Sequence, residues 1–188
     1  LEARGWGKAV DPDGDCTLTE AKGKLTIAVP GRLHDLFPGQ RDPKKRNNAP
    51  RVLQAVKGDF TALVKVTADW KPGAPLPGAN THPYNGAGLL IWDTDTQFIR
   101  FERNVWAARD GNWSYTTPLQ YTDGRQVNAV KTTRDEFFKD RSTWLKVERA
   151  ADAFTFAISH DGEKWQEAAK LTAKLPESVR VGVEAVNS

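Results

Sequence analysis

The sequence contains one cysteine, no methionine and no long apolar run. With Cys16 alone no intrachain disulfide can form, so the burial of apolar side chains must stabilise the fold. No stretch approaches the roughly 20 apolar residues of a membrane helix, and the polar start of the chain does not resemble a signal peptide. We therefore expect no membrane insertion. Since no Met begins the chain, we expect it to be part of a longer protein, for which an extracytoplasmic location is favoured.

The charge balance gives little support for nucleic-acid binding. The net charge is +3, and the basic residues are spread out except between Arg41 and Arg51. That segment fits either a phosphate-binding patch or a solvated loop. No helix with basic periodicity accompanies it, so we do not expect a nucleic-acid partner.

Strand patterns dominate the rest of the chain. Residues 60–70 show the clearest alternation of apolar and polar side chains, and Asp161-Gly162 predicts a hairpin turn between two later strands. The other predicted strands are 24–29, 51–56, a pair within 86–104, 113–121, 125–132, 144–149, 153–159, 164–171 and 179–187. This number of short strands predicts an all-β fold over residues 1–188 as a single domain.

Helix signals are few, and two segments are predicted loops. Thr133 to Asp140 begins with an N-cap pattern and predicts about one helical turn. Lys71 to Pro83 is rich in proline and glycine, and a second loop is expected between about Pro30 and Pro50. Long loops in a compact β fold are often functional.

The segment 86–104 carries the most information about function. In its second strand Arg100, Glu102 and Asn104 share one face, while Ile99 and Phe101 share the other. The polar row suits either hydrogen bonding to a polar ligand or cross-strand pairing on a solvated face. The register of the intervening turn decides whether Ile91 or Trp92 lies on the face of Arg100, and the sequence leaves this open.

Several motifs together resemble a known family. These are Asp11-Pro-Asp-Gly-Asp-Cys16, Leu25-Thr-Ile-Ala-Val-Pro-Gly31, His34-Asp-Leu36, Asn48-Ala-Pro-Arg-Val-Leu-Gln54, Gly58-Asp-Phe-Thr61, Gly86-Ala-Gly-Leu-Leu-Ile-Trp92, Ile99-Arg-Phe-Glu-Arg-Asn104 and Ser159-His-Asp-Gly-Glu-Lys-Trp165. They resemble bacterial domains of unknown function in the concanavalin A-like lectin/glucanase superfamily, some of which carry the label "regulation of enolase". The resemblance implies a two-sheet antiparallel jelly-roll sandwich with one concave sheet.

The resemblance also implies carbohydrate as the ligand class. We expect a non-catalytic, lectin-like module that binds a glycan or another polar small ligand through Arg100, Glu102 and Asn104. Trp92 and Trp106 would stack on sugar rings, and His34 would contact the ligand from its loop. A structural or protein-interaction domain is a further alternative.

An enzyme is the runner-up interpretation. A glycan hydrolase or lyase would use Glu102, with a second carboxyl from Glu148, Glu184 or Asp93. The glucanases of the superfamily carry a Glu-x-Asp-x-x-Glu type of strand, from which this sequence departs. Arg100 and the next basic residue, Arg103, are expected to lower the pKa of Glu102, which suits a charged hydrogen-bond acceptor better than a general acid.

Metal binding has one candidate motif. Asp11, Asp13 and Asp15 alternate as in calcium loops, although the glycine and the distal glutamate of an EF-hand are missing. A polar turn before the first strand is the alternative, and it is favoured. No His-x-x-x-His pattern or cysteine cluster supports zinc. We therefore expect no cofactor, with calcium as the candidate if a metal binds.

Overall fold

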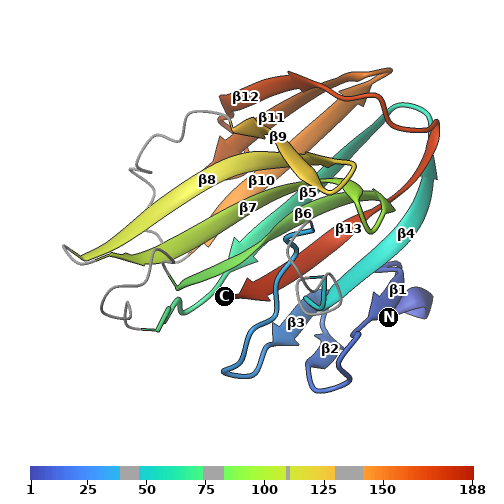
Figure 1. Cartoon of the computed structure of the whole chain (residues 1–188). Helices are drawn as coiled ribbons and strands as arrows, with labels where there is room; N and C mark the ends of the chain where they lie inside the picture. The colour runs from blue at the N-terminus through green and yellow to red at the C-terminus, as the bar shows by residue number, and fades with distance from the viewer. Residues whose placement is uncertain (39–46, 74–82, 109–110, 130–141) are drawn as a thin grey trace.

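The structure, a computed structural model, describes residues 1–38, 47–73, 83–108, 111–129 and 142–188, and these form an almost purely β fold (Figure 1). A single 3-10 turn, η1 (Glu2–Arg4), precedes the strands. The strands are β1 (Lys8–Val10), β2 (Thr17–Ala21), β3 (Lys24–Ala28), β4 (Arg51–Lys57), β5 (Phe60–Thr67), β6 (Tyr84–Thr94), β7 (Gln97–Ala108), β8 (Gly111–Thr122), β9 (Arg125–Ala129), β10 (Ser142–Ala150), β11 (Ala153–Ser159), β12 (Gln166–Thr172) and β13 (Ser178–Asn187). No described helix is long and apolar enough to cross a membrane.

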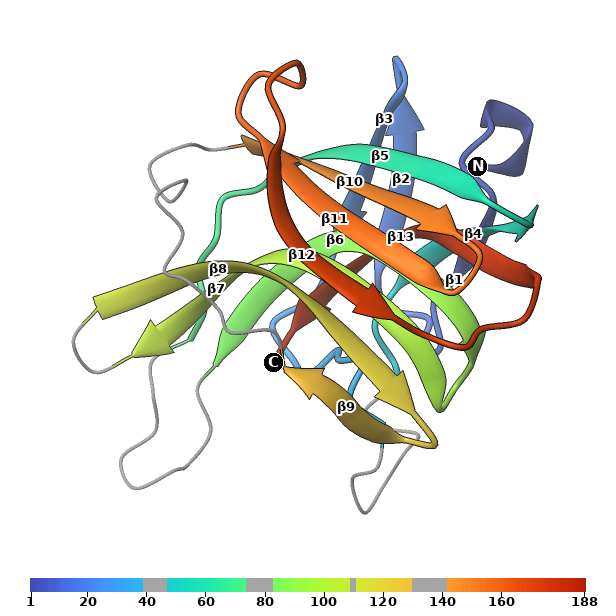
Figure 2. The ribbon, with the colours of Figure 1, turned by 90° about the horizontal axis from the view of Figure 1, so that it is seen from above.

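Two antiparallel sheets stack face to face, as Figure 2 shows. The larger sheet has the order β1-β4-β13-β6-β7-β8-β9, and the smaller has the order β12-β11-β10-β5. Between them lies the main core, to which β4, β5, β6, β7 and β10 to β13 contribute side chains. Phe101 of β7, for example, packs edge-on against Phe156 of β11, with 5.1 Å between the ring centroids. The expected two-sheet antiparallel jelly-roll sandwich is thus confirmed.

The larger sheet also buries its other side, which we call the outer face. A second apolar cluster forms there, made of Leu53, Leu90, Trp92, Phe98, Tyr121 and Val186. Leu36 and Ala49, which precede β4 in the chain, pack onto this cluster. We call residues 32–38 the covering segment. It is tied to the end of β13 by two backbone hydrogen bonds between His34 and Asn187, of 2.8 and 2.9 Å.

The hairpin of β6 and β7 settles the register that the sequence left open. Trp92 pairs with Phe98 and Thr94 with Gln97, with an irregularity between Trp92 and Thr94. Trp92 therefore lies on the outer face with Arg100, whereas Ile91 points into the main core.

Most predicted strands occur within one to three residues of their predicted bounds. The predicted strand 24–29 corresponds to β3. Its hairpin partner β2 was not predicted, and neither was β1. The predicted helical turn at 133–140 lies outside the described residues. So do the central parts of both predicted loops.

Candidate functional site

The polar row of β7 lies on the outer face and is buried. Arg100, Glu102 and Asn104 are only 3%, 1% and 5% exposed. The covering segment contributes Asp35, whose Oδ1 accepts hydrogen bonds from Tyr84 Oη at 2.6 Å and from Arg100 Nη1 at 3.3 Å. The row therefore belongs to an interior polar network, and the alternative of a charge pair on a solvated face does not describe it.

Two carboxyl groups meet above β6. Gly88 pairs with Glu102 of β7 on one side and with Glu184 of β13 on the other. A glycine at this position has no side chain to separate them, and the two carboxyl groups come close enough to share a hydrogen bond. Gly86 also leaves room, because a Cβ there would lie 2.6 Å from Glu102 Oε2.

Burial favours the protonated form of this pair. It raises the pKa of Glu102, although the Arg100 guanidinium opposes the shift. Burial together with the charge of Glu102 holds the pKa of Glu184 well above its usual value. The expectation that arginines lower the pKa of Glu102 was therefore wrong in its net direction. Arg100 acts as expected but is outweighed, and Arg103 points to the opposite side, where it donates to Thr143 Oγ1 at 2.8 Å.

The carboxylate oxygens of this pair have few partners. All four are buried, and within the described residues no donor satisfies them by hydrogen-bond geometry. Arg100 Nε lies 3.0 Å from Glu102 Oε1, which makes an ion pair, but the N–H group does not point along that contact. Buried oxygen atoms that lack a hydrogen-bond donor are usually satisfied by a proton, a water molecule or a ligand.

The row ends in a partly exposed aromatic residue. Trp106 donates from Nε1 to Asn104 Oδ1 at 2.8 Å, and its ring stacks on that of Tyr84 with 5.2 Å between centroids and an interplanar angle of 17°. The outer face of the larger sheet thus brings together the buried amide of Asn104, the buried ring of Tyr84 and the partly exposed indole of Trp106.

Trp92 and His34 lie elsewhere. Trp92 is 1% exposed, because it is sandwiched between Phe98 at 4.7 Å and the Arg51 guanidinium at 4.4 Å. His34 faces away from the polar row toward Asp15, with 2.9 Å between Nε2 and Oδ1. The structure therefore brings together Arg100, Glu102, Asn104 and Trp106, and it leaves Trp92 and His34 out of that group.

The residues around the row come from distant parts of the chain. Of the three suggested second carboxyls, only Glu184 reaches Glu102; Glu148 is ion-paired with Lys146 on the smaller sheet. Asp35 and Tyr84 were not predicted. The two alternate glycines, Gly86 and Gly88, were the available signal, since glycine in a strand marks a close approach of neighbouring groups.

The three aspartates of the calcium motif each bind protein groups. Asp11 Oδ2 accepts from the Cys16 amide at 2.9 Å, and Asp13 Oδ2 accepts from Asn48 Nδ2 at 2.7 Å. Asp15 pairs with Arg32 through one oxygen and with His34 through the other. Burial raises the pKa of Asp15, but these two partners outweigh it and lower the pKa below its usual value.

Comparisons with solved structures show the fold. A functionally unknown protein from Saccharomyces cerevisiae superimposes with a TM-score of 0.75 at 16% identity, over 97% of this chain and 88% of that one. A mutant of the GH43 protein BlXynB from Bacillus licheniformis gives a TM-score of 0.53 at 15% identity, over 80% of this chain but 30% of that chain. At such identities the likeness concerns the fold alone.

The sequence comparisons identify a family. A search of curated proteins found no match, and the label "regulation of enolase" finds no support. The family DUF1349, described as a protein of unknown function, matches residues 15–187. This match covers most of the chain, which therefore belongs to the DUF1349 family.

Proposed function

We propose that this protein is a non-catalytic β-sandwich module that binds carbohydrate or a glycoconjugate at the outer face of its larger sheet. The supporting observation is the buried polar row that ends at the partly exposed Trp106. Asn104 and Trp106 would make the first contacts with a sugar, and Arg100 and Glu102 would bind hydroxyl groups deeper in the site.

The chemistry of the row suits a ligand rich in hydroxyl groups. The carboxylate oxygens of Glu102 and Glu184 lack donors among the described residues, and hydroxyl groups would supply them. Asn104 both donates and accepts, and an indole ring offers an apolar face to a pyranose. Because Glu102 is 1% exposed, a ligand reaches it only if the groups that bury it move.

The meeting of two carboxyl groups favours the enzyme alternative, and their burial opposes it. Glycosidases hold the two carboxyl groups on either side of a bound sugar, about 5–5.5 Å apart for retention or about 6.5–9.5 Å apart for inversion. Glu102 and Glu184 are each only 1% exposed, which leaves no open cleft between them for a substrate in the described part of the chain. The fold is shared with part of a GH43 protein, which supports an association with glycans but gives no catalytic group.

Glycan-array screening of the purified protein, followed by calorimetry with the best ligand, tests this function. We expect Trp106→Ala and Asn104→Ala to abolish binding. Trp165→Ala is the matched control, since Trp165 is also partly buried but packs beneath Lys146 on the smaller sheet. No glycan bound by the wild type, or equal loss in all three variants, would favour a structural domain. Sustained release of reducing sugar that Glu102→Gln removes would favour the hydrolase.

A further inference from the structure

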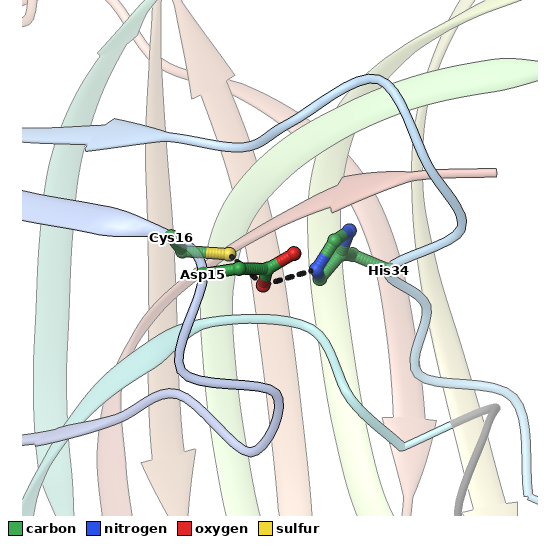
Figure 3. Close-up of side chains that lie close together, drawn as sticks. All are labelled: Asp15, Cys16 and His34. Carbon is green, nitrogen blue, oxygen red and sulfur yellow. Dashed lines mark hydrogen bonds and ion pairs between the residues drawn. The ribbon is translucent and has the colours of Figure 1, made fainter.

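A second cluster of polar side chains lies beside the covering segment, apart from the polar row. Asp15 and Cys16 precede β2, and His34 approaches them from the covering segment (Figure 3). One donor atom from each of the three lies within 4.8 Å of the other two. Asp13 Oδ2 is 3.8 Å from His34 Nε2 and offers a fourth donor.

The hydrogen bonds of His34 fix which ring nitrogen is available. Nδ1 lies 2.9 Å from the carbonyl oxygen of Arg32, which can only accept, so Nδ1 carries the hydrogen. In a neutral ring, Nε2 then presents a lone pair to Asp15 Oδ1 at 2.9 Å. Two lone pairs at this distance require a positive charge between them, either a proton or a metal ion. Histidine ligands of metals commonly donate their other N–H to a carbonyl in this way.

We propose that Asp15, Cys16 and His34 form a binding site for a divalent transition-metal ion of the zinc type, with Asp13 or water as the fourth ligand. A set of nitrogen, sulfur and oxygen donors suits such an ion, whereas calcium takes oxygen ligands only. The sequence patterns considered for zinc and for calcium do not include this combination of ligands. His34 is distant from Asp15 and Cys16 in the sequence, and only the fold places it beside them.

The distances support a four-coordinate ion. Bonds of 2.0–2.3 Å in a tetrahedron place neighbouring ligand atoms roughly 3.3–3.8 Å apart. Asp15 Oδ1 and Cys16 Sγ are 3.7 Å apart, and the His34 and Asp13 atoms are 3.8 Å apart. The contact between His34 and Asp15 would lengthen by a few tenths of an ångström. His34 itself is completely buried, so its ring is held in position.

The charges around the cluster favour a cation. The carboxylates of Asp13 and Asp15 face His34 Nε2 at 3.8 and 2.9 Å. Asp11 Oδ1 is also buried with no hydrogen-bond partner among the described residues. Asp13 and Arg32, which contact His34 and Asp15 respectively, line an open hollow of about 610 Å³.

Cobalt titration of untagged protein tests the site. Co²⁺ bound by a cysteine gives a thiolate charge-transfer band, and Cys16 is the only cysteine in the chain. We expect one Co²⁺ per chain with this band, displacement of Co²⁺ by Zn²⁺, and protection of Cys16 from a thiol reagent. Cys16→Ser should lose the band, and Asp15→Asn should weaken binding roughly tenfold or more. Neither change removes the buried ring of His34, so both variants should fold.

His160→Asn is the matched control, because His160 is exposed at the turn between β11 and β12 and belongs to no such cluster of the described residues. It should bind Co²⁺ like the wild type. Absence of the thiolate band in the folded wild type would overturn the site and leave a proton between His34 and Asp15. Equal binding by the wild type and Cys16→Ser would overturn it as well.

Discussion

Glu102 and Glu184 reach each other from strands on opposite sides of β6, directly across Gly88. Neither side chain could do so over a larger residue, and neither carboxyl group is more than 1% exposed. Burial of two carboxyl groups with one arginine favours a shared proton over two negative charges. This arrangement makes the stability of the protein depend on the protonation of the two carboxyl groups.

The first prediction concerns the pH dependence of stability. The pKa of Glu184 is raised in the folded protein, so between its ordinary value of 4.5 and the raised value the folded state holds a proton that the unfolded state releases. This contribution to stability is present below pH 4.5 and is lost as the pH rises. Glu184→Gln, which imitates the protonated acid, should remove that decline and be at least as stable as the wild type at pH 8.

Urea unfolding at several pH values measures this effect. Glu163→Gln is the control, because Glu163 is exposed in the turn between β11 and β12. Loss of stability in Glu184→Gln at pH 8 would show that Glu184 is charged in the folded protein.

The second prediction concerns the glycine between the two carboxyl groups. A Cβ on Gly88 would lie 2.7 Å from Glu102 Cα and closer still to the carbonyl oxygen of Phe101. Gly88→Ala must therefore shift the backbone of β7, and we expect a loss of about 3 kcal/mol in unfolding free energy or no folding. Gly31→Ala has no atom within 4 Å of the new Cβ and should change stability by no more than about 0.5 kcal/mol. Equal stability of the two variants in urea would refute the prediction.

The third prediction concerns the buried arginine. Arg100 lies 3.0 Å from Glu102 and 3.3 Å from Asp35. Arg100→Ala leaves both carboxyl groups without their cation, and we expect a loss of roughly 3–5 kcal/mol in unfolding free energy. Arg125→Ala, at an exposed position in β9, should have almost no effect. A loss below about 1 kcal/mol for Arg100→Ala would mean that the network is solvated in solution.

The fourth prediction concerns the turn after β11. Oδ1 of Asp161 accepts hydrogen bonds from the amides of Lys164 and Glu163, and these bonds lower the pKa of Asp161 to about 2. The carboxylate therefore stabilises the turn above pH 3.8, and this contribution disappears as the pH falls to about 2. Asp161→Ala should have a lower melting temperature than the wild type at pH 5. The difference should shrink by pH 2, and Asp152→Ala, at another exposed turn, should show no such pattern.

The sequence predicted the sandwich better than the site. Alternation along β5 and β7 depends on neighbours in the chain, so it can be read locally. The face on which Trp92 lies depends on the irregular register beside Thr94, and no local pattern specifies it. The meeting of Glu102 with Glu184, and of Asp15 with His34, depends on contacts between distant segments. The sign of the pKa shift at Glu102 was missed for the same reason, since burial is a property of the whole fold.

The position of β13 has a consequence for how the chain folds as it is synthesised. This strand, Ser178–Asn187, pairs with β4 on one side and with β6 on the other, as Figure 1 shows. The larger sheet therefore stays in two separate pieces until β13 has left the ribosome, whereas β5, β10, β11 and β12 can pair earlier. Until then the edges of β4 and β6 that face β13 have no partner strand, and unpaired strand edges make an incompletely folded chain prone to aggregation.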